Sequence, residues 1–592
     1  MSDLWNYIEN SNNDIDLIKS DKYDRLSNSA KSDKLVKSVN SDKSDKSSKS
    51  TKSTKSTKSD KLDCNGLEII VCQKGIKINI KELQELDIYR KIINYFTISV
   101  PHMGGYIKKV PNHRILKNGG QIIFPRFGML KYIDNNFTNY NIINNIKSGI
   151  NPLIEFKWTG AFTNNQPIIA NYIMQNYFNK NTSDNAKSGV ILNLDAGQGK
   201  TYLATGLIEK LQRKTLIVCH TISILNQWVQ VLKSSYPNNT IARYYGGIKE
   251  DGDICVAIIN SLLMDKLYNK NGCVEPIKFF QDYGYVIFDE IHLYSSTSRK
   301  QIYNKCQRKY MLGLSATPDE NKDGLDLVNT WNCGDVLNAI NIEGYTVEDI
   351  PFKGEVTSIK YIGNPEYIKI LMNDKMDIIN HSGMVNQICE DPYRLHIIVK
   401  LIFSLRESNQ NIFVFADRRS YLLKIETYMN IFGLKSNNLF NESDVTKLMG
   451  GSSAETMDKA KDSAKVILTT YAFMGTGVSI PRMDAIILAT PRKTKSRQYI
   501  NRIFRLGGDY DIVRKIIDIV DWGTHMKSQW YKRKKYYIEK QYPIINNKIK
   551  WDDINTEMIQ MGLKQAETHE IKELSDLDKS LLKLESLLKL IN

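Results

Sequence analysis

The chain has 592 residues, of which 42% are hydrophobic and 10% aromatic, and it carries a formal net charge of +16. This length exceeds what one hydrophobic core usually supports, so we expect several domains. No apolar run approaches the roughly 18–20 residues that span a bilayer, and the N-terminus lacks the pattern of a secretory signal, so we expect an intracellular, soluble protein. The eight cysteines are scattered without a C-x-x-C pair, which argues against zinc clusters and disulfide frameworks.

The first part of the chain divides into a tail and a small module. Residues 1–62 are expected to be disordered, because their Ser- and Lys-rich tract has almost no apolar residues to offset the entropy of ordering. Residues 63–155 are expected to form an accessory α+β module, with strands near Leu67–Cys72 and Ile122–Phe124 around a helical stretch at 81–96. We find no catalytic constellation there. His102 and His113 are interpreted as isolated structural residues.

Two longer regions alternate apolar strands with helical patterns, which predicts two consecutive α/β domains with parallel sheets, over residues 156–335 and 336–540. The strands expected in the first domain are Val190–Leu194, Thr215–Cys219, Ile254–Ile259, Val286–Phe288 and Met311–Leu314. Those expected in the second are Ile412–Phe415, Lys465–Thr469, Ala485–Ala489 and Ile516–Val520. Residues 541–592 are expected to be a helical extension, whose leucine seam favours docking on its own domain over a coiled-coil dimer.

Positive charge is concentrated late in the chain. Residues 492–550 carry 16 Lys and Arg against 5 Asp and Glu, whereas residues 1–61 carry 13 against 10. The late segment also contains aromatic residues, so it is a candidate for binding a polyanion with stackable bases, such as nucleic acid. The alternative is a solvated basic helix. The aromatic residues in question are Trp530, Tyr531, Tyr536 and Tyr537.

A glycine-rich loop joins the first predicted strand of the 156–335 region to a helical stretch. Its residues are Ala196, Gly197, Gln198, Gly199, Lys200 and Thr201. Glycine lets the backbone approach phosphates closely, Lys200 can reach the β- and γ-phosphates, and the Thr201 hydroxyl can bind Mg²⁺. The strict G-x-x-x-x-G-K-[ST] pattern is not met, because Leu194 stands at the first glycine position. The loop predicts a nucleoside-triphosphate site.

Asp289 and Glu290 follow a second apolar strand, at the sheet edge where open α/β proteins bind their ligands. Asp289 would hold Mg²⁺ through water, and Glu290 would orient and deprotonate the attacking water. The alternative is that both are surface acids that cap the next helix. His292 is interpreted as coupling this motif to others.

The order of these motifs resembles that of the superfamily 2 DExH-box helicases, over residues 166–505. The resemblance implies that Gln166 reads adenine and that Ser315 and Thr317 link hydrolysis to strand movement. It also implies that three further segments grip a nucleic-acid strand. These are 215–221 together with Gln227 and Trp228, 246–247, and 259–262.

Two segments of the second domain resemble motifs that complete the nucleotide site of this family. Gly475–Pro481 is similar to the motif at the interdomain cleft, which implies nucleotide contact by Gly477, although Ser479 replaces the usual Asp. The segment 498–505 resembles Q-x-x-G-R-x-x-R, with Asn501 in place of Gly. The resemblance implies a coupling role for Gln498 and arginine-finger roles for Arg502 and Arg505. The alternative is that both are surface arginines in a basic stretch.

Within the superfamily, the chain resembles the branch that holds the phage UvsW helicase and the poxvirus transcript-release helicase, with relatives in large DNA viruses. This implies two RecA-like domains, the cofactors ATP and Mg²⁺, and DNA or RNA as partner. It also implies a helicase in viral transcription or DNA metabolism, with transcription or replication machinery as candidate partners and the virion as a candidate location. The alternatives are a translocase or remodeller without processive unwinding, a non-enzymatic nucleic-acid-binding protein, and the motor subunit of a restriction system.

Overall fold

A computed structural model of the protein describes residues 61–563, except 102–105, 118, 179–184, 196, 270–271, 319–323, 347–352, 374–377, 437, 439, 442–443, 475–479, 493–495, 505–508 and 510. Residues 1–60 of the predicted tail and the leucine seam lie outside the described residues, whereas Leu62, assigned to the tail by the sequence, belongs to strand β1 (Leu62–Asp63). Three candidate site residues, Ala196, Gly477 and Arg505, also lie outside the described residues.

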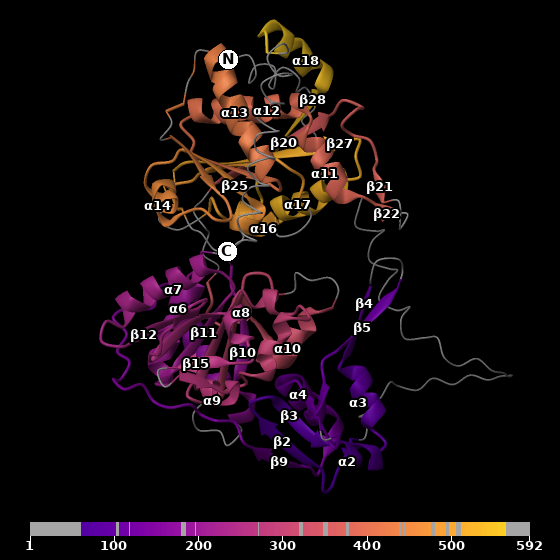
Figure 1. Ribbon diagram of the computed structural model, residues 1–592, viewed down its shortest axis with the longest axis vertical. Coiled ribbons are helices and arrows are strands. Elements are labelled where there is room, and N and C mark those ends of the chain that lie inside the picture. Colours follow the sequence, from indigo (N-terminus) through magenta and orange to yellow (C-terminus); the bar gives the residue numbers. More distant parts are fainter. Residues whose placement is uncertain are drawn as a thin grey trace, which may run out of the picture. The chain divides into compact units, whose positions relative to one another are not determined.

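The accessory module is built on a five-stranded sheet (Figure 1). Its strand order is β6 (Arg114–Ile115), β7 (Gln121–Phe124), β3 (Gly75–Asn79), β2 (Glu68–Cys72) and β9 (Asn141–Asn144). The remaining elements are β1 (Leu62–Asp63), which pairs with β8 (Phe137–Thr138), the hairpin of β4 (Thr97–Pro101) and β5 (Ile107–Pro111), and the helices α2 (Ile80–Glu85), α3 (Tyr89–Tyr95) and α4 (Arg126–Asn136). The helical stretch predicted at 81–96 is thus two helices. Asp87 between them has φ of +53°, which a continuing right-handed helix does not allow.

The first α/β domain has an eight-stranded sheet, parallel at every pairing except that of β12 with β13. Its order is β13 (Ile248–Lys249), β12 (Ile241–Tyr245), β14 (Ile254–Ile258), β11 (Thr215–Cys219), β17 (Tyr285–Asp289), β18 (Tyr310–Ser315), β10 (Gly189–Asn193) and β19 (Val336–Asn338). Its α-helices are α5 (Gln166–Asn176), α6 (Lys200–Leu211), α7 (Ile222–Ser235), α8 (Ile259–Leu262), α9 (Pro276–Gln281) and α10 (Asp326–Cys333). Short 3₁₀ helices, η2 (Asn185–Lys187), η3 (Ile291–Tyr294), η4 (Arg299–Asn304) and η5 (Ala339–Asn341), and a hairpin of β15 (Leu267–Asn269) and β16 (Gly272–Val274) complete it.

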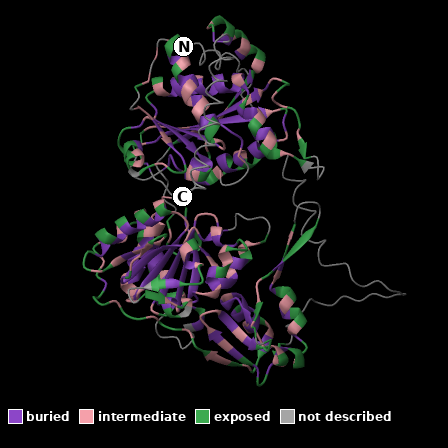
Figure 2. Ribbon diagram, in the orientation of Figure 1, coloured by how far each residue is buried: buried purple, intermediate pink, exposed green. Residues whose placement is uncertain are grey.

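The strands of this sheet are continuous apolar runs because both faces of the sheet are covered by helices. Alternate residues of β11 enter different cores: Ile217 packs with α5, α6 and α7, whereas Leu216 packs with α8, α9 and α10. Figure 2 shows the strands as buried. This is the parallel sheet that the sequence predicts.

The second α/β domain has a seven-stranded sheet in which every pairing is parallel. Its order is β24 (Val445–Leu448), β25 (Val466–Thr470), β23 (Ile412–Ala416), β26 (Ala485–Leu488), β27 (Arg514–Trp522), β20 (Gly354–Ile362) and β28 (Ile544–Lys550). One face packs against α11 (His381–Cys389), α12 (Pro392–Glu407), α13 (Arg419–Ser436) and α18 (Trp551–Gln560). The other packs against α14 (Ala454–Asp462), α15 (Tyr471–Met474), α16 (Ser496–Ile500) and α17 (Lys527–Glu539). A short hairpin of β21 (Met372–Asn373) and β22 (Ile378–Ile379) lies before α11. Together the two sheets form the tandem RecA-like architecture.

The expected helical extension at 541–592 differs from the structure at its start. Residues 544–550 form the edge strand β28, which pairs in parallel with β20 over the full length of β28. Its Asn and Lys residues are poor strand formers, and the strand exists because β20 offers an unpaired edge. The helix α18 follows it and buries Ile554 and Met558 in the core of the domain.

The accessory module and the first α/β domain share one hydrophobic core. Arg126 is fully buried there and donates hydrogen bonds to the carbonyl oxygens of Ala186, at 2.6 Å, and of Arg308. Gly128 of α4 lies so close to Trp331 of α10 that a Cβ on it would stand 2.6 Å from the indole. Within the described ranges, no helix combines the length and the hydrophobicity that crossing a bilayer requires.

Candidate active site

Three neighbouring strands end at one edge of the first sheet and carry the predicted motifs there. The strands β17, β18 and β10 are adjacent, with Asp289 opposite Leu314 and Asn193 opposite Ser315. Because parallel strands end at the same edge, the glycine-rich loop, the two carboxylates and Ser315 are brought together, as ligand sites in open α/β sheets require.

The glycine-rich loop turns through two left-handed residues before α6. Gly197 has φ of +91° and Gly199 has φ of +73°, conformations that cost glycine little. Gly199 directly precedes α6, so the free N–H groups of the first helical turn lie at the loop. The Lys200 ammonium group donates hydrogen bonds to the carbonyl oxygens of Leu194, at 2.8 Å, and Asp195, at 3.2 Å. The arrangement can receive a polyphosphate.

Gln166 lies against this loop, although 33 residues separate it from Gly199. Its side-chain Oε1 accepts a hydrogen bond from the backbone N–H of Thr163 at 3.1 Å, and its Nε2 lies 3.5 Å from the carbonyl oxygen of Gly199. A Cβ on Gly199 would stand 2.3 Å from that Nε2, so a side chain at this position would displace the Gln166 amide. The structure therefore places Gln166 beside the phosphate-binding candidate.

Asp289 and Glu290 occupy contrasting electrostatic surroundings. Burial, and then the charge of Glu290, raise the pKa of Asp289 to about 6. Burial would also raise the pKa of Glu290, but the positive charges of His292, Lys200 and Arg502 together hold it below its ordinary value. Glu290 adopts φ of +51°, which is uncommon for a residue other than glycine. Glu290 is therefore ionised near neutral pH, whereas Asp289 takes up a proton at a higher pH than an ordinary aspartate does.

His292 connects the carboxylates to the Ser315 motif. Its Nδ1 lies 3.4 Å from Glu290 Oε2 and forms a hydrogen bond of 3.0 Å with Ser315 Oγ. The same hydroxyl oxygen accepts a hydrogen bond from the backbone N–H of Thr317 at 3.0 Å. A movement of the Glu290 side chain can thus be transmitted through His292 and Ser315 to the backbone after β18.

Trp228 differs from its predicted role in gripping a strand. Its side chain is 1% exposed, and its indole Nε1 donates a hydrogen bond of 2.9 Å to Asp289 Oδ2. The helical position of Trp228 on the buried face of α7 prevents contact with a nucleic acid. The sequence does contain a pattern that indicates this burial: Ile224, Leu225 and Trp228 have the spacing of one apolar helix face.

The two other short motifs assigned to strand contact meet at the surface. The backbone N–H of Gly246 donates a hydrogen bond of 3.2 Å to Ser261 Oγ. A Cβ on Gly246 or Gly247 would have no heavy atom within 4 Å, so the space above this turn is open.

The segment after α16 reaches the glycine-rich loop. A Cβ on Gly197 would stand 3.6 Å from the carbonyl oxygen of Phe504. Arg502 is 4% exposed and its charge acts on Glu290, so the interpretation of Arg502 as a surface arginine is wrong. Gln498, also buried, has an Oε1 that forms no hydrogen bond with any described residue.

The basic segment 492–550 is less available for stacking than its composition indicates. Trp530, Tyr536 and Tyr537 are buried on the face of α17 that packs against the second sheet, which contradicts their predicted contact with bases. Arg533 on the same face forms a bidentate ion pair with Asp518, with both distances 2.7 Å. Among the four aromatic residues, Tyr531 is the exposed one, at 54%. The helical spacing of these residues predicts a face buried in the core. The excess of Lys and Arg in the segment instead favoured an exposed, nucleic-acid-binding surface.

Comparisons with known proteins agree with this geometry. Residues 141–320 match the family model described as type III restriction enzyme, res subunit. QP509L of African swine fever virus (isolate Pig/Kenya/KEN-50/1950), described as an ATP-dependent RNA helicase, is 30% identical over 371 residues, which cover 60% of this chain and 69% of that protein. L396 of Acanthamoeba polyphaga mimivirus, with the same description, is 26% identical over 452 residues, which cover 74% of this chain and 79% of L396.

Among solved structures, that of T4 UvsW is similar at 16% sequence identity and a TM-score of 0.29, and the match covers 82% of this chain and 99% of that one. The relationship to the viral proteins, over most of their length, decides the family. The chain belongs to the superfamily 2 helicases, among the ATP-dependent helicases of large DNA viruses, and is a nucleoside-triphosphate hydrolase.

Proposed function

We propose that the protein couples ATP hydrolysis at this site to the unwinding of a nucleic acid, in viral transcription or DNA metabolism. One observation carries the proposal: the segment after α16 of the second α/β domain reaches the glycine-rich loop of the first, where the carbonyl oxygen of Phe504 lies beside Gly197. The charges of Lys200 and Arg502, one from each domain, accordingly both act on Glu290. A site assembled from two sheets can respond to nucleotide by changing how the domains engage, which is the form of motion that a motor needs.

The proposed binding roles follow the geometry of the loop. Gly197, Gly199 and the N-terminus of α6 receive the phosphates, Lys200 neutralises them, and Gln166 beside Gly199 contacts the adenine. Ala196, Gln198 and Gly477 are proposed as further nucleotide contacts. A side chain at Gly199, whose φ is +73°, would be strained and would displace the Gln166 amide, which fits a site where a backbone must approach its ligand.

The residues present fit a magnesium ion bound together with a nucleotide. Thr201 and Asp289 would hold it, and Mg²⁺ would supply charge neutralisation on the phosphates. Glu290 Oε2 is buried and forms no hydrogen bond with a described residue, so the site has an acceptor available to a water molecule. Among the residues that the structure describes, no group of three or more His, Cys, Asp and Glu side chains is placed to hold a metal ion by itself.

Glu290 is proposed as the group that accepts a proton from the attacking water. The neighbouring positive charges favour its ionised form, and an ionised carboxylate can orient that water and accept its proton. Arg502 and Arg505 are proposed to neutralise charge that develops on the phosphoryl group. His292, Ser315, Thr317 and Gln498 are proposed to transmit the result to the strand-binding surface.

The experiment is ATP hydrolysis by the full chain with single-stranded DNA, duplex DNA, RNA and an RNA–DNA hybrid, beside a strand-displacement assay. Glu290→Gln keeps the size of the side chain and is expected to lower the hydrolysis rate about 10²- to 10⁴-fold while nucleotide binding persists. Hydrolysis with strand displacement supports a helicase, and hydrolysis without displacement supports the translocase alternative. Unchanged hydrolysis in Glu290→Gln contradicts the proposed role of this residue.

A further inference from the structure

A cavity of about 280 Å³ opens where the accessory module meets the first α/β domain. It is lined by β5, by the turn that follows β5, by the end of β7, and by η4 together with Asn332 of α10. None of the residues assigned to nucleotide lines it. The cavity is therefore a separate feature, and the hydrolytic mechanism makes no use of it.

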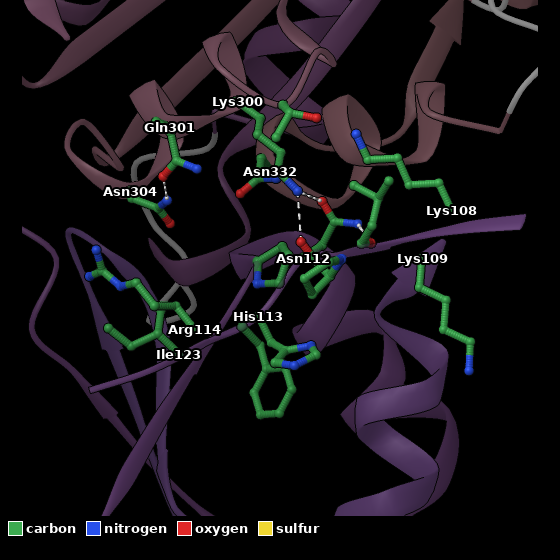
Figure 3. Close-up of a pocket in the computed structure, with 15 residues that line it drawn as sticks. Lys108, Lys109, Asn112, His113, Arg114, Ile123, Lys300, Gln301, Asn304 and Asn332 are labelled. Carbon is green, nitrogen blue, oxygen red and sulfur yellow. Dashed lines mark hydrogen bonds between the residues drawn. The ribbon is translucent and has the colours of Figure 1, made fainter. Parts of the chain in front are cut away.

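The lining of this cavity is strongly cationic. Lys108, Lys109, Arg114 and Lys300 all contribute to it, and among the described residues around it there is no Asp or Glu. Lys108, Lys109 and Arg114 are exposed. Consecutive strand residues point to opposite sides, and Figure 3 shows the Lys109 side chain directed away from Lys300, whereas that of Lys108 extends toward the side of the first α/β domain. Four cations without a counter-charge in the lining indicate an anionic ligand.

Lys300 occupies the inner part of the cavity and is only partly paired. Its ammonium group donates hydrogen bonds to the carbonyl oxygen of Pro111, at 2.7 Å, and to Asn112 Oδ1, at 3.1 Å. An ammonium group has three N–H donors, so these bonds leave one for a ligand. Burial disfavours the charged form of Lys300 and lowers its pKa to about 8, and a bound anion would stabilise that charged form.

His113 supplies a second unsatisfied group. Its ring Nδ1 is buried and forms no hydrogen bond with any described residue. Burial, and then the charge of Lys300, lower the pKa of His113, so at neutral pH the ring is uncharged and can present a donor or an acceptor. The sequence suggests an isolated structural histidine, whereas in the structure His113 is one of the residues that line the cavity (Figure 3).

The distribution of the cations fits a chain of phosphates better than a single ion. Figure 3 shows Arg114 on one side of the cavity and Lys108 and Lys109 on the other, with Lys300 and His113 between them. Beside the lysines, Tyr106 is 77% exposed and Ile107 is 67% exposed. Tyr106 precedes Lys108 by two residues, a separation of about 7 Å along an extended strand, which is within reach of a base attached to a bound phosphate.

We propose that this cavity binds the sugar–phosphate backbone of the nucleic-acid strand, as a contact additional to the surface of the two α/β domains, with Tyr106 stacking on a base. The inference rests on the proposed function, because it assumes that the substrate of the motor is a nucleic acid. It assigns to the accessory module a direct part in holding the strand.

The test compares two double variants of the full chain by fluorescence anisotropy with labelled single-stranded DNA and RNA over a range of salt concentrations. Lys108→Gln/Arg114→Gln removes two cavity cations. Lys81→Gln/Lys91→Gln removes two exposed cations from α2 and α3 of the same module and changes the net charge equally. Each lost phosphate contact lowers the slope of log affinity against log salt by about 0.7 on single strands. The cavity variant is expected to lose a slope of about 1.4 and affinity on the order of tenfold at low salt, whereas the control keeps the wild-type slope.

Tyr106→Ala separates stacking from charge. It is expected to weaken binding several-fold at every salt concentration while the slope stays that of the wild type, because no phosphate contact is removed. Melting curves check that the variants fold, and ATP hydrolysis without nucleic acid is expected to be unchanged in all of them.

Equal slopes and affinities for the cavity variant and its control overturn the inference. The inference is also overturned if the cavity binds inorganic phosphate but the two double variants bind the nucleic-acid strand equally well. Either result leaves the proposed function intact if wild-type hydrolysis is stimulated by nucleic acid. Absence of stimulation and of strand binding in the wild type contradicts the proposed function itself.

Discussion

Asp289 and Glu290 are adjacent in the chain, yet the fold shifts their pKa values in opposite directions. Asp289 is buried beside Glu290, and its hydrogen bond from Trp228 only partly offsets the rise. Glu290 is surrounded by His292, Lys200 and Arg502. Two carboxylates with separated pKa values can take different parts in one reaction, such as the metal ligand and the base that we propose.

Trp228 is expected to act as a positioning residue for Asp289. Trp228→Phe removes the indole N–H and keeps most of the buried ring, so Asp289 loses the bond that fixes its orientation. We expect the Mg²⁺ concentration for half-maximal ATP hydrolysis to rise about 10- to 100-fold, as for other groups that support a metal ligand. The measurement is the hydrolysis rate as a function of Mg²⁺.

Trp158→Phe is the matched control for this variant. The indole nitrogen of Trp158 is buried in the same domain but forms no hydrogen bond with a described residue. If both variants need the same Mg²⁺ as the wild type, Trp228 has only a packing role.

The sequence identifies those site residues that belong to a local pattern of strand and loop. Lys200, Asp289 and Glu290 are each recognisable because a strand precedes them and a loop carries them. The contact of Trp228 with Asp289 joins residues 61 positions apart, and no local spacing indicates which strand end an indole will reach. The place of His113 in the cavity likewise could not be predicted, because η4, which lines the cavity with it, is distant in the chain.

Among the elements, α18 shows how the edge of the second sheet is completed. It follows β28, and its Glu557 lies 2.5 Å from the Lys400 ammonium group and 3.4 Å from His396 Nε2 of α12. Burial would raise the pKa of Glu557, but the hydrogen bond with His396 and the charge of Lys400 lower it to about 2. The carboxylate therefore helps to dock α18 on α12.

This arrangement predicts a pH-dependent loss of stability. Because the pKa of Glu557 falls from 4.5 to about 2 on folding, its contribution is complete above pH 4.5 and disappears as the pH falls toward 2. Glu557→Gln is expected to lower the free energy of unfolding at pH 7 by about 1 kcal/mol, with allowance for solvent screening. The difference from the wild type is expected to shrink below pH 4.5. Thermal unfolding at several pH values measures it, with the exposed Glu455→Gln as control, and a difference that is constant with pH contradicts the account.

The elements that sequence patterns predict well are those with a strong apolar period. The strands β11, β17 and β25 appear within one residue of their expected positions, because continuous runs of Val, Ile and Leu have few other solutions. The strands β20 and β28 are not among the predicted ones, because polar residues interrupt their apolar runs without a regular period and because the two paired strands lie some two hundred residues apart in the chain. The buried face of α17 was predictable from its helical spacing, but its charge suggested an exposed surface.

At the scale of the whole molecule, the candidate site combines residues of both α/β domains. Arg502→Lys keeps a positive charge but loses the planar guanidinium group, which binds phosphate oxygens in a bidentate manner. We expect a fall of about 10³-fold or more in the rate of ATP hydrolysis with a small change in nucleotide affinity, as for other arginine fingers. Rates and nucleotide binding are measured on the same preparation.

Arg497→Lys is the control for Arg502→Lys. Arg497 belongs to the same α16 segment, and its side chain is half-exposed in an ion pair of 2.6 Å with Glu539. We expect near wild-type hydrolysis from it, since exposed ion pairs contribute little. Equal losses in the two variants would indicate that the segment is sensitive for structural reasons.

The tandem sheets were predictable from the sequence because each is a series of alternating strands and helices. The junction of the accessory module with the first domain was not. Arg126 reaches carbonyl groups 60 and 182 residues away, and Gly128 packs on Trp331. Such contacts depend on how complete elements pack, which no local motif encodes. The cavity proposed to hold the strand is a product of this junction.

The most direct test of the central claim is the rate of ATP hydrolysis as nucleic acid is added to the wild-type chain and to Lys200→Ala. Lys200 is expected to neutralise the phosphates in the glycine-rich loop, so its removal abolishes hydrolysis with and without nucleic acid. We expect a wild-type rate that rises with nucleic acid to a plateau and a Lys200→Ala rate at background. A wild-type rate that nucleic acid does not change, or a stimulated rate that survives in Lys200→Ala, would contradict it.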